Sequence, residues 1–510
     1  MESRRTENTT RNIIWGILNQ GVMTFMPFIV RTVLLYTLGT EYLGLNSLFS
    51  SIIQVLNLTE LGFSSAVNFN LYKAIADENT ELICALMEFY KRVYRIMGLI
   101  ILCIGLIIIP FLKSFINGSY PAEINIYTLY LIYLFNTVIT YFLFAYKNAL
   151  INAHQRVDLD NKVMMTTYLL QYSTQIISLF IFLDYYLYLI FMPICTVLAN
   201  VIRAIIANKM FPNYSPRGKL DSETTINIRR RVCGVMISKF CVISRNSFSN
   251  IFISSFLGLT SVAIYGNYYY VLSTVYSILN VLILSMQASV GNSIIQKSIK
   301  NNYHDMQKIS FIFSWLSTWF MVCMLCLYQP FIRLWVGNDL VYPLHIVVMF
   351  CVYFYSLSMI AIVSMYAVAA GIWWEHRYAA VAEAITNILL NYLFCRIWGV
   401  SGVIMATFIS ILLFNFVTRT YITFKMYFKK ISPKIFYANH LFYAIIAALT
   451  ASITYYVCSF IPSSGFYELL IKGCICIVLP NVILLVGYNR HALFKESMGY
   501  MKIIMIRKNN

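Results

Sequence analysis

Three basic residues lie deep inside long apolar segments of this 510-residue chain: Arg31, Lys239 and Arg245. A charge at the centre of a membrane-spanning helix costs about 2.5 to 3.5 kcal/mol on insertion scales. Such residues usually face a protein interior or a water-filled cavity, where they mark the path of an ion or a substrate. We therefore expect the three cations to line a path for an anionic group.

Polar residues at helical spacing accompany Arg31. Gln20, Thr24 and Pro27 precede it at intervals that keep all four residues on one face of a helix. Pro27 has no backbone N–H, so one backbone hydrogen bond of the helix is missing on that face. Arg31 thus belongs to a polar stripe, which indicates a surface that does not face lipid.

Two further segments carry similar stripes. In the seventh apolar segment, Lys239, Asn246 and Asn250 share a face and Arg245 lies on the adjoining flank. The polar residues of the second apolar segment cover about a third of the helix circumference. They are Gln54, Asn57, Glu60, Ser64 and Asn68.

Composition indicates the elements that position these residues. The chain is 60% hydrophobic and only 11% charged, whereas soluble domains carry roughly 25% charged residues. We predict an all-α, polytopic membrane protein, because about fourteen segments approach the ~20 apolar residues that a spanning helix needs. The predicted spans are 12–38, 43–71, 93–112, 125–146, 163–183, 186–208, 232–257, 263–290, 310–329, 343–370, 379–397, 402–424, 440–461 and 468–487.

The basic residues predict the topology. Of 38 Lys and Arg, thirty fall on the side that holds both termini, and only Lys113, Arg333, Arg396 and Lys472 fall on the other. Lys and Arg mark the cytoplasmic face, so both termini are expected inside the cell, with the chain in the cytoplasmic membrane. The net charge of +18 is therefore a topology signal spread over short loops, and we expect no nucleic-acid partner.

Helix rise separates the three cations in depth. At 1.5 Å per residue, Arg31, Arg245 and Lys239 lie roughly 12, 20 and 28 Å below the outer ends of their helices. This ladder favours an anion path. Two alternatives are open. Glu60 lies roughly 27 Å deep and could form a structural ion pair with Lys239, or the span boundaries are misplaced and the cations snorkel to the interface. Near the cytoplasmic ends, three further charged residues are expected to snorkel to the interface: Arg203, Arg419 and Glu383.

Other chemistry finds little support in the sequence. Cys323-x-x-Cys326 lies in an apolar segment without a second pair, and we interpret both as buried structural cysteines. No two histidines have metal-ligand spacing, and neither G-x-x-x-x-G-K-[ST] nor G-x-G-x-x-G occurs. We expect no cofactor, no metal and no enzymatic activity.

A polar stretch divides the chain near its middle. Residues 209–231 form a predicted cytoplasmic linker between an N-lobe, 1–208, and a C-lobe, 232–424; residues 425–510 hold two additional spans and a tail. A weak repeat crosses this linker. Arg11 opens a span ending at Leu38-Gly39, and Arg231 opens one ending at Leu257-Gly258.

The N-terminal region resembles a known family, the Wzx-type flippases of bacterial polysaccharide and O-antigen biosynthesis. These belong to the multidrug/oligosaccharidyl-lipid/polysaccharide (MOP) exporter superfamily. The resemblance covers roughly residues 1–110; beyond them only the span count, the layout of six, six and two spans, and the Arg245 region agree. The residues concerned are Arg31, Leu38-Gly39-Thr40-Glu41-Tyr42-Leu43-Gly44-Leu45, Leu48-Phe49, Glu60-Leu61-Gly62-Phe63-Ser64-Ser65-Ala66 and Leu71-Tyr72-Lys73.

The resemblance implies two six-helix lobes in a V-shaped, MATE-like arrangement that alternate access around a central cationic cavity. The implied substrate is an undecaprenyl-pyrophosphate-linked oligosaccharide for O-antigen, capsule or another surface glycan. Arg31, Arg245 and Lys239 would then guide the diphosphate, while polar residues such as Gln20, Asn57, Asn246 and Asn250 would contact or hydrate sugars. A polysaccharide polymerase and co-polymerase are implied partners, and the chain is expected to act as a monomer.

Two other functions remain open. A cation-coupled multidrug exporter of the same superfamily would be expected to place carboxylates in the cavity, whereas the deep charges here are mostly basic. A membrane glycan polymerase or glycosyltransferase would need a sizeable outward loop, and the predicted outward loops are short.

Overall fold

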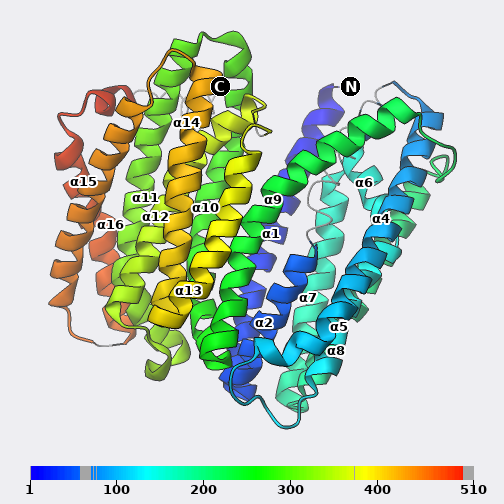
Figure 1. Cartoon of the computed structure of the whole chain (residues 1–510), viewed down its shortest axis with the longest axis horizontal. Coiled ribbons are helices and arrows are strands. Elements are labelled where there is room, and N and C mark those ends of the chain that lie inside the picture. The colour runs from blue at the N-terminus through cyan, green and yellow to red at the C-terminus, as the bar shows by residue number, and fades with distance from the viewer. Residues whose placement is uncertain are drawn as a thin grey trace. The chain divides into compact units, whose positions relative to one another are not determined.

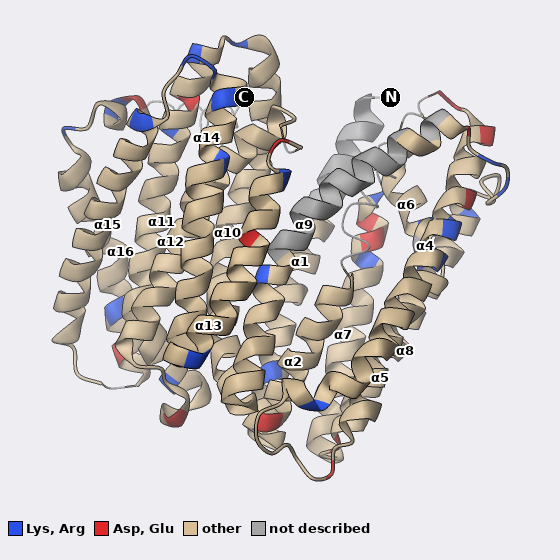
Figure 2. Cartoon of the chain, viewed as in Figure 1, with Lys and Arg blue, Asp and Glu red and all other residues tan. Residues whose placement is uncertain are grey.

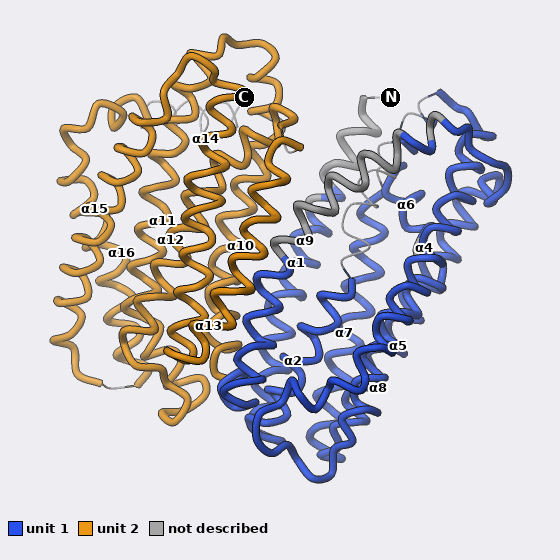
Figure 3. Tube along the Cα trace, viewed as in Figure 1, with its two compact units in different colours: residues 1–263 blue, residues 264–510 orange. Residues whose placement is uncertain are grey.

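The computed structural model describes residues 2–57, 70–72, 74–75, 77–154, 156–372, 374–463 and 465–497. Side chains are described for these residues except 2–10, 13, 145, 223–224, 227–242 and 288. Within these ranges the regular structure is helical throughout, and no strand occurs. The chain divides into two compact units, Met1–Ala263 and Ile264–Asn510 (Figure 3). The division into lobes at 209–231 stays a prediction.

Unit 1 is a bundle of long helices (Figure 1). Helix α1 packs along α7, α7 along α8, and α2 along α9, while α4 and α8 both pack on α5. The elements are α1 (Glu2–Leu38), α2 (Thr40–Leu56), α4 (Thr80–Ile108), the 3-10 helix η2 (Ile109–Phe115), α5 (Ile126–Phe142), α6 (Ala145–Ala153), α7 (Val157–Ile181), α8 (Tyr185–Met210), α9 (Ser222–Leu257) and the first turn of α10 (Leu259–Gln296).

Unit 2 begins within α10 and is organised around a central helix, α11 (Ile299–Val336), which packs against α12, α15 and α16. A π-helical stretch, η4, continues α13. The remaining elements are η3 (Asn338–Leu340), α12 (Leu344–Ala369), α13 (Arg377–Ser410), η4 (Ile411–Arg419), α14 (Thr420–Thr423), η5 (Phe424–Phe428), α15 (Lys434–Ser459) and α16 (Phe466–Tyr488).

The helices confirm the predicted fold class, an all-α polytopic membrane protein. Within the described ranges, nine helices are long and apolar enough to cross a membrane, or ten if the bent pair α5 and α6 counts as one span. The predicted spans 379–397 and 402–424 lie in one continuous run, Arg377–Phe428. Gly399 interrupts that run with φ of 58°, so the expected break between the two spans is present.

Two glycines end helices at corresponding positions of the predicted repeat. Gly39 separates α1 from α2 with φ of 99°, and Gly258 separates α9 from α10 with φ of 86°. Residues with a Cβ atom avoid such positive φ values, whereas glycine adopts them readily. Both Leu-Gly sequences therefore mark a break between two long helices, as the repeat predicts.

Charged side chains lie mainly near helix ends. Figure 2 shows long central stretches of most helices without Lys, Arg, Asp or Glu. Charged residues are rare in these stretches because a charge inside the hydrocarbon of a membrane is costly. The few charges inside helices are therefore the residues that need a specific explanation.

Candidate functional site

Arg31 connects three helices of unit 1. From α1, its Nη1 atom donates a hydrogen bond to the Ser47 hydroxyl of α2 at 3.5 Å. Its Nη2 atom donates to the carbonyl oxygen of Ala263, in the first turn of α10, at 3.1 Å. Hydrogen bonds from a charged donor are stronger than those between neutral groups. The half-buried guanidinium therefore holds α1 against both neighbours.

The polar stripes of α2 and α9 face one another. Asn250 Nδ2 donates to Ser51 Oγ at 2.8 Å, and Ser247 Oγ donates to Gln54 Oε1 at 3.2 Å. Ser51 in turn donates to the backbone carbonyl of Ser47, the residue that Arg31 contacts. Arg31, Ser47, Ser51 and Asn250 are thus connected by hydrogen bonds, and the pair Ser247 and Gln54 lies on the same two helices, α9 and α2. We call these six residues the polar seam.

Arg245 and Asn246 lie on α9 beside the polar seam. Arg245 is buried, with 7% of its surface exposed. Asn246 is half-buried, and its side-chain oxygen has no hydrogen-bond partner in the part of the chain that the structure describes. Lys239 belongs to α9, but its side chain lies outside the described residues, as does the whole of Glu60. The anion path and the alternative ion pair between Lys239 and Glu60 therefore stay predictions.

Two predicted site residues lie elsewhere in unit 1. Gln20 is exposed on α1, where its Nε2 atom donates to Thr24 Oγ1 at 3.4 Å. Asn57 caps the C-terminus of α2, and its side-chain oxygen accepts a hydrogen bond from the Tyr141 hydroxyl at 3.3 Å. The structure thus brings Arg31 and Asn250 into the polar seam and directs Asn57 to a separate cavity.

That cavity lies between α2, α5, α7 and α8 and has a volume of about 260 Å³. Its wall is rich in neutral amides and hydroxyls, and Thr196 Oγ1 donates to Asn136 Oδ1 there at 2.8 Å. We call it the polar cavity. Its polar lining residues are Asn57, Asn136, Thr137, Thr140, Tyr141, Thr167, Tyr168, Gln171, Thr196, Asn200 and Arg203.

A signal for the polar cavity is present in the sequence but was not recognised there. In each of three predicted spans, two polar residues are separated by one helical turn and therefore share a face. Spans four to six each read as apolar overall, which hides such pairs. The pairs are Asn136 and Thr140, Thr167 and Gln171, and Thr196 and Asn200.

Two expectations about charged residues at the predicted cytoplasmic ends of the helices are wrong. Arg203 does not snorkel; it pairs with Asp160 of α7 at 2.6 Å, and both side chains are less than 20% exposed. Arg419 pairs with Glu383 at 3.4 Å, and Glu383 is only 1% exposed. The reason is the same in both cases: a neighbouring helix supplies the opposite charge, so neither side chain needs to reach the interface.

A buried carboxylate also connects α1 to the start of α7. Asp158 is fully buried and lies 3.2 Å from Arg11, 2.9 Å from Arg156 and 4.0 Å from Lys162. Burial raises the pKa of this carboxyl, but the hydrogen bond and charge of Arg156, together with Arg11 and Lys162, lower the pKa below its ordinary value. The ionised form of Asp158 is therefore the one that stabilises unit 1.

Together these features suit a ligand with two chemical parts. A guanidinium binds phosphate oxygens with charge-assisted hydrogen bonds. Neutral amides and hydroxyls both donate and accept hydrogen bonds, as the hydroxyls of a sugar require. In unit 1, the guanidinium of Arg31 lies in the polar seam, and neutral amides and hydroxyls line the polar cavity.

Comparison with solved structures identifies the fold. A structure described as lipid II flippase MurJ in an inward closed conformation aligns with a TM-score of 0.68 and 15% identity, over 94% of this chain and 99% of that chain. An inward-facing multidrug resistance MATE family transporter of the MOP superfamily aligns at 0.60 and 16% identity, over 80% and 99%.

A third structure, a MOP superfamily transporter from Pyrococcus furiosus described as having a binding pocket of reverse polarity, aligns at 0.54 and 14% identity, over 84% and 96%. No protein-family model and no curated protein sequence matches the chain. The three alignments cover nearly all of the other chains, and all three are transport proteins. The chain therefore has the fold of the MOP superfamily transporters.

Proposed function

We propose that this protein is a flippase that moves an undecaprenyl-pyrophosphate-linked oligosaccharide across the bacterial cytoplasmic membrane for surface polysaccharide biosynthesis. The observation that carries the proposal is the polar seam of unit 1, in which Arg31 joins three helices inside membrane-length segments. A half-buried guanidinium inside a membrane-length segment is costly, and it can bind the oxygens of an anionic lipid head group.

The neighbouring structures support this choice of substrate class. The structure with the TM-score of 0.68 is described as a lipid II flippase, and a lipid-linked substrate for the present chain is consistent with that description. The diphosphate would interact with Arg31 and Arg245, and with Lys239 as a further member of the ladder. The sugars would contact Asn57 and the other neutral groups of the polar cavity.

The proposal includes the arrangement of the chain in its membrane. Both termini would face the cytoplasm, and the substrate would enter from the inner leaflet and leave to the outer leaflet by alternating access. A polysaccharide polymerase with its co-polymerase would receive the product. The covalent structure of the substrate would be unchanged, which distinguishes this function from a glycan polymerase or glycosyltransferase.

Reconstitution tests the proposal directly. Purified protein is placed in liposomes with a fluorescent undecaprenyl-pyrophosphate oligosaccharide, and the label exposed on each leaflet is measured by a membrane-impermeant quencher. We expect faster exchange than in protein-free liposomes. Arg31→Ala and Arg245→Ala should each slow the exchange at least tenfold, because a charge-assisted hydrogen bond contributes about 1.5 to 3 kcal/mol.

A matched control tests whether the loss of any arginine slows exchange or only the loss of Arg31 or Arg245. Arg396 is an exposed arginine whose guanidinium lies 4.3 Å from the centre of the Tyr392 ring on α13. Arg396→Ala should leave exchange unchanged. If Arg31→Ala and Arg245→Ala both support normal exchange at equal protein levels, these arginines do not bind the anion and the proposal fails.

A second candidate is a cation-coupled multidrug exporter. The specific observation in its favour is the alignment with a MATE family multidrug transporter at a TM-score of 0.60. Cells expressing the protein would then tolerate cationic drugs better than cells expressing an inactive variant, and liposomes would show no exchange of the lipid-linked sugar. That pair of results would favour the exporter over the flippase.

A further inference from the structure

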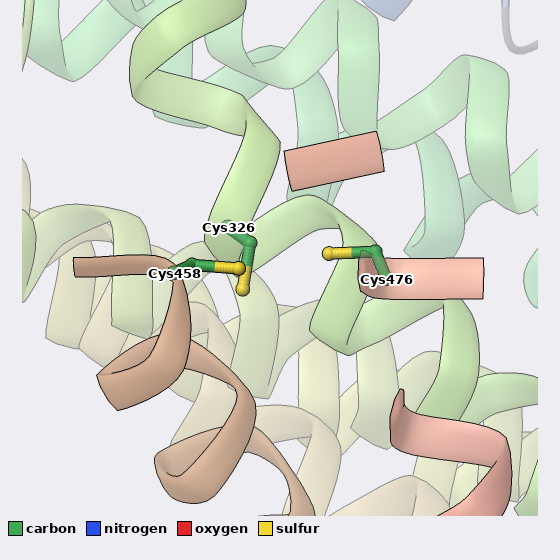
Figure 4. Close-up of side chains that lie close together, drawn as sticks. All are labelled: Cys326, Cys458 and Cys476. Carbon is green, nitrogen blue, oxygen red and sulfur yellow. The ribbon is translucent and has the colours of Figure 1, made fainter. Parts of the chain in front are cut away.

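Three cysteines from three different helices meet inside unit 2. Cys326 of α11, Cys458 of α15 and Cys476 of α16 are each buried, with 1% to 3% of their surface exposed. Their sulfur atoms all lie within 4.8 Å of one another, and Figure 4 shows the side chains directed toward a common point. We call this group the cysteine triad.

The triad changes the interpretation of the Cys323-x-x-Cys326 motif. The sequence offers no second pair nearby, so both residues resemble ordinary buried cysteines. The fold instead supplies two sulfur partners for Cys326 from α15 and α16. Cys323 has a different role, because its sulfur donates a weak hydrogen bond to the Cys476 carbonyl at 3.8 Å.

Neighbouring contacts hold the triad in place. Trp319 Nε1 donates to the same Cys476 carbonyl at 2.9 Å, which fixes the backbone of α16 against α11. One and two turns before Cys476 on the same face of α16 are Lys472 and Glu468, which form an ion pair at 2.7 Å. Arg333 of α11 lies 3.7 Å from Glu468. A rigid supporting shell of this kind is what a ligand site requires.

We propose that the cysteine triad binds one Cu(I) ion. Soft thiolate ligands select Cu(I), Zn²⁺ or iron–sulfur clusters, and the triad presents sulfur alone. With metal–sulfur bonds of about 2.3 Å, three sulfurs in a plane around one ion lie about 4.0 Å apart. The sulfurs need to approach by less than an ångström from their separation of up to 4.8 Å.

The charge balance of the site is compatible with this ion. Each thiol that binds the metal loses one proton, so three thiolates with one Cu(I) carry two net negative charges. Lys472 lies one helical turn from Cys476, and Lys472 and Arg333 share the single carboxylate of Glu468, so this group carries one net positive charge. That charge partly offsets the cost of burying the metal–thiolate group. The ion would join α15 and α16 to α11 through three metal–sulfur bonds.

The number of ligands favours Cu(I) over zinc. Structural Zn²⁺ sites are almost always four-coordinate, and Cys323 is the nearest candidate for a fourth ligand. Its sulfur is engaged with the Cys476 carbonyl instead. Cu(I) is satisfied with three sulfurs. Cys323 is not one of the three cysteines whose sulfurs all lie within 4.8 Å of one another. Zinc binding would therefore require Cys323 to join the triad as a fourth ligand, whereas Cu(I) binding would not.

The test uses the full-length protein in detergent, kept under anaerobic and reducing conditions. Cu(I) is supplied from a coloured competing chelator, and bound copper per chain is measured after desalting. We expect one tightly held Cu(I), with three sulfur neighbours at about 2.3 Å by X-ray absorption. The apparent melting temperature should rise when Cu(I) binds, because only the folded state holds the three sulfurs close together and therefore binds the ion more tightly.

Single substitutions separate the site from the other cysteines. Cys458→Ser should weaken Cu(I) binding at least tenfold, whereas Cys323→Ser and the exposed Cys474→Ser should keep one tightly held ion. Cys458→Ala serves as a second variant if the serine protein does not purify as a monodisperse species. Three results would overturn the proposal: equal Cu(I) binding by wild type and Cys458 variants, a zinc site that depends on Cys323, or a disulfide between triad members under the same reducing conditions.

Discussion

Gly44 of α2 packs tightly against Leu259, the first residue of α10. A Cβ atom built on Gly44 would collide with the Leu259 carbonyl oxygen and lie 2.8 Å from both the carbonyl carbon and the Cβ atom of Leu259. Ordinary carbon–carbon contacts are about 3.5 to 4.0 Å. Gly44→Ala must therefore separate the two helices by roughly one ångström.

The separation also disturbs the polar seam. Arg31 contacts both helices, through Ser47 on α2 and Ala263 on α10. Its bond to Ser47 is already 3.5 Å long, so an added ångström would leave only one of the two bonds within hydrogen-bond distance. Overpacking costs about 1 to 3 kcal/mol and the lost bond, whose donor is charged, about 1.5 kcal/mol, while alanine gains about 1 kcal/mol in helix propensity. The expected net loss is about 1.5 to 3.5 kcal/mol.

Thermal unfolding of the purified protein in detergent measures this loss, and the liposome exchange assay measures its effect on Arg31. Gly473→Ala is the matched control, because a Cβ on Gly473 in α16 meets nothing within 4 Å. We expect Gly44→Ala to melt at a lower temperature than both wild type and Gly473→Ala and to exchange substrate more slowly. If Gly44→Ala is as stable as Gly473→Ala, the close packing of α2 on α10 is not as described and the reasoning is refuted.

Three further predictions concern the charged pairs and the polar cavity. Glu383→Gln should destabilise the protein by about 3 to 5 kcal/mol, because the buried charge of Arg419 loses the carboxylate with which it pairs. In a double-mutant cycle of thermal stability, adding Arg419→Gln should recover part of that loss. Asp158 has a lowered pKa, so its stabilising charge is fully present above the ordinary carboxyl pKa of about 3.9 and is lost as pH falls through the lower folded value. Melting temperatures between about pH 6 and pH 3 should therefore fall more steeply for wild type than for Asp158→Asn, and equal slopes would contradict the ionised pairing. Asn57→Leu removes the hydrogen bond from Tyr141 and places an apolar group in the polar cavity, so liposome exchange should fall several-fold while the yield of folded protein stays near that of wild type; unchanged exchange would remove the cavity from the substrate path.

The sequence by itself determined the helices and their class. Apolar length predicts spans because a helix must cover about 30 Å of hydrocarbon, and that requirement is local to each segment. The breaks at Gly39 and Gly258 are also local, since positive φ favours glycine wherever it occurs. The apolar length of a segment also shows that Arg31 and Arg245 lie inside spans. Both could therefore be identified from the sequence as costly charges.

Only the tertiary structure decided which side chains meet. Glu383 lies far from Arg419 in sequence, and three cysteines of the triad come from α11, α15 and α16. Periodicity fixes the face of a helix that a residue occupies, but not which other helix packs on that face. The snorkelling expected of Arg203 failed for this reason, because Asp160 of α7 neutralises it. Which side chains pair depends on how the helices pack against one another. The sequence of one helix does not show which other helix will lie beside it.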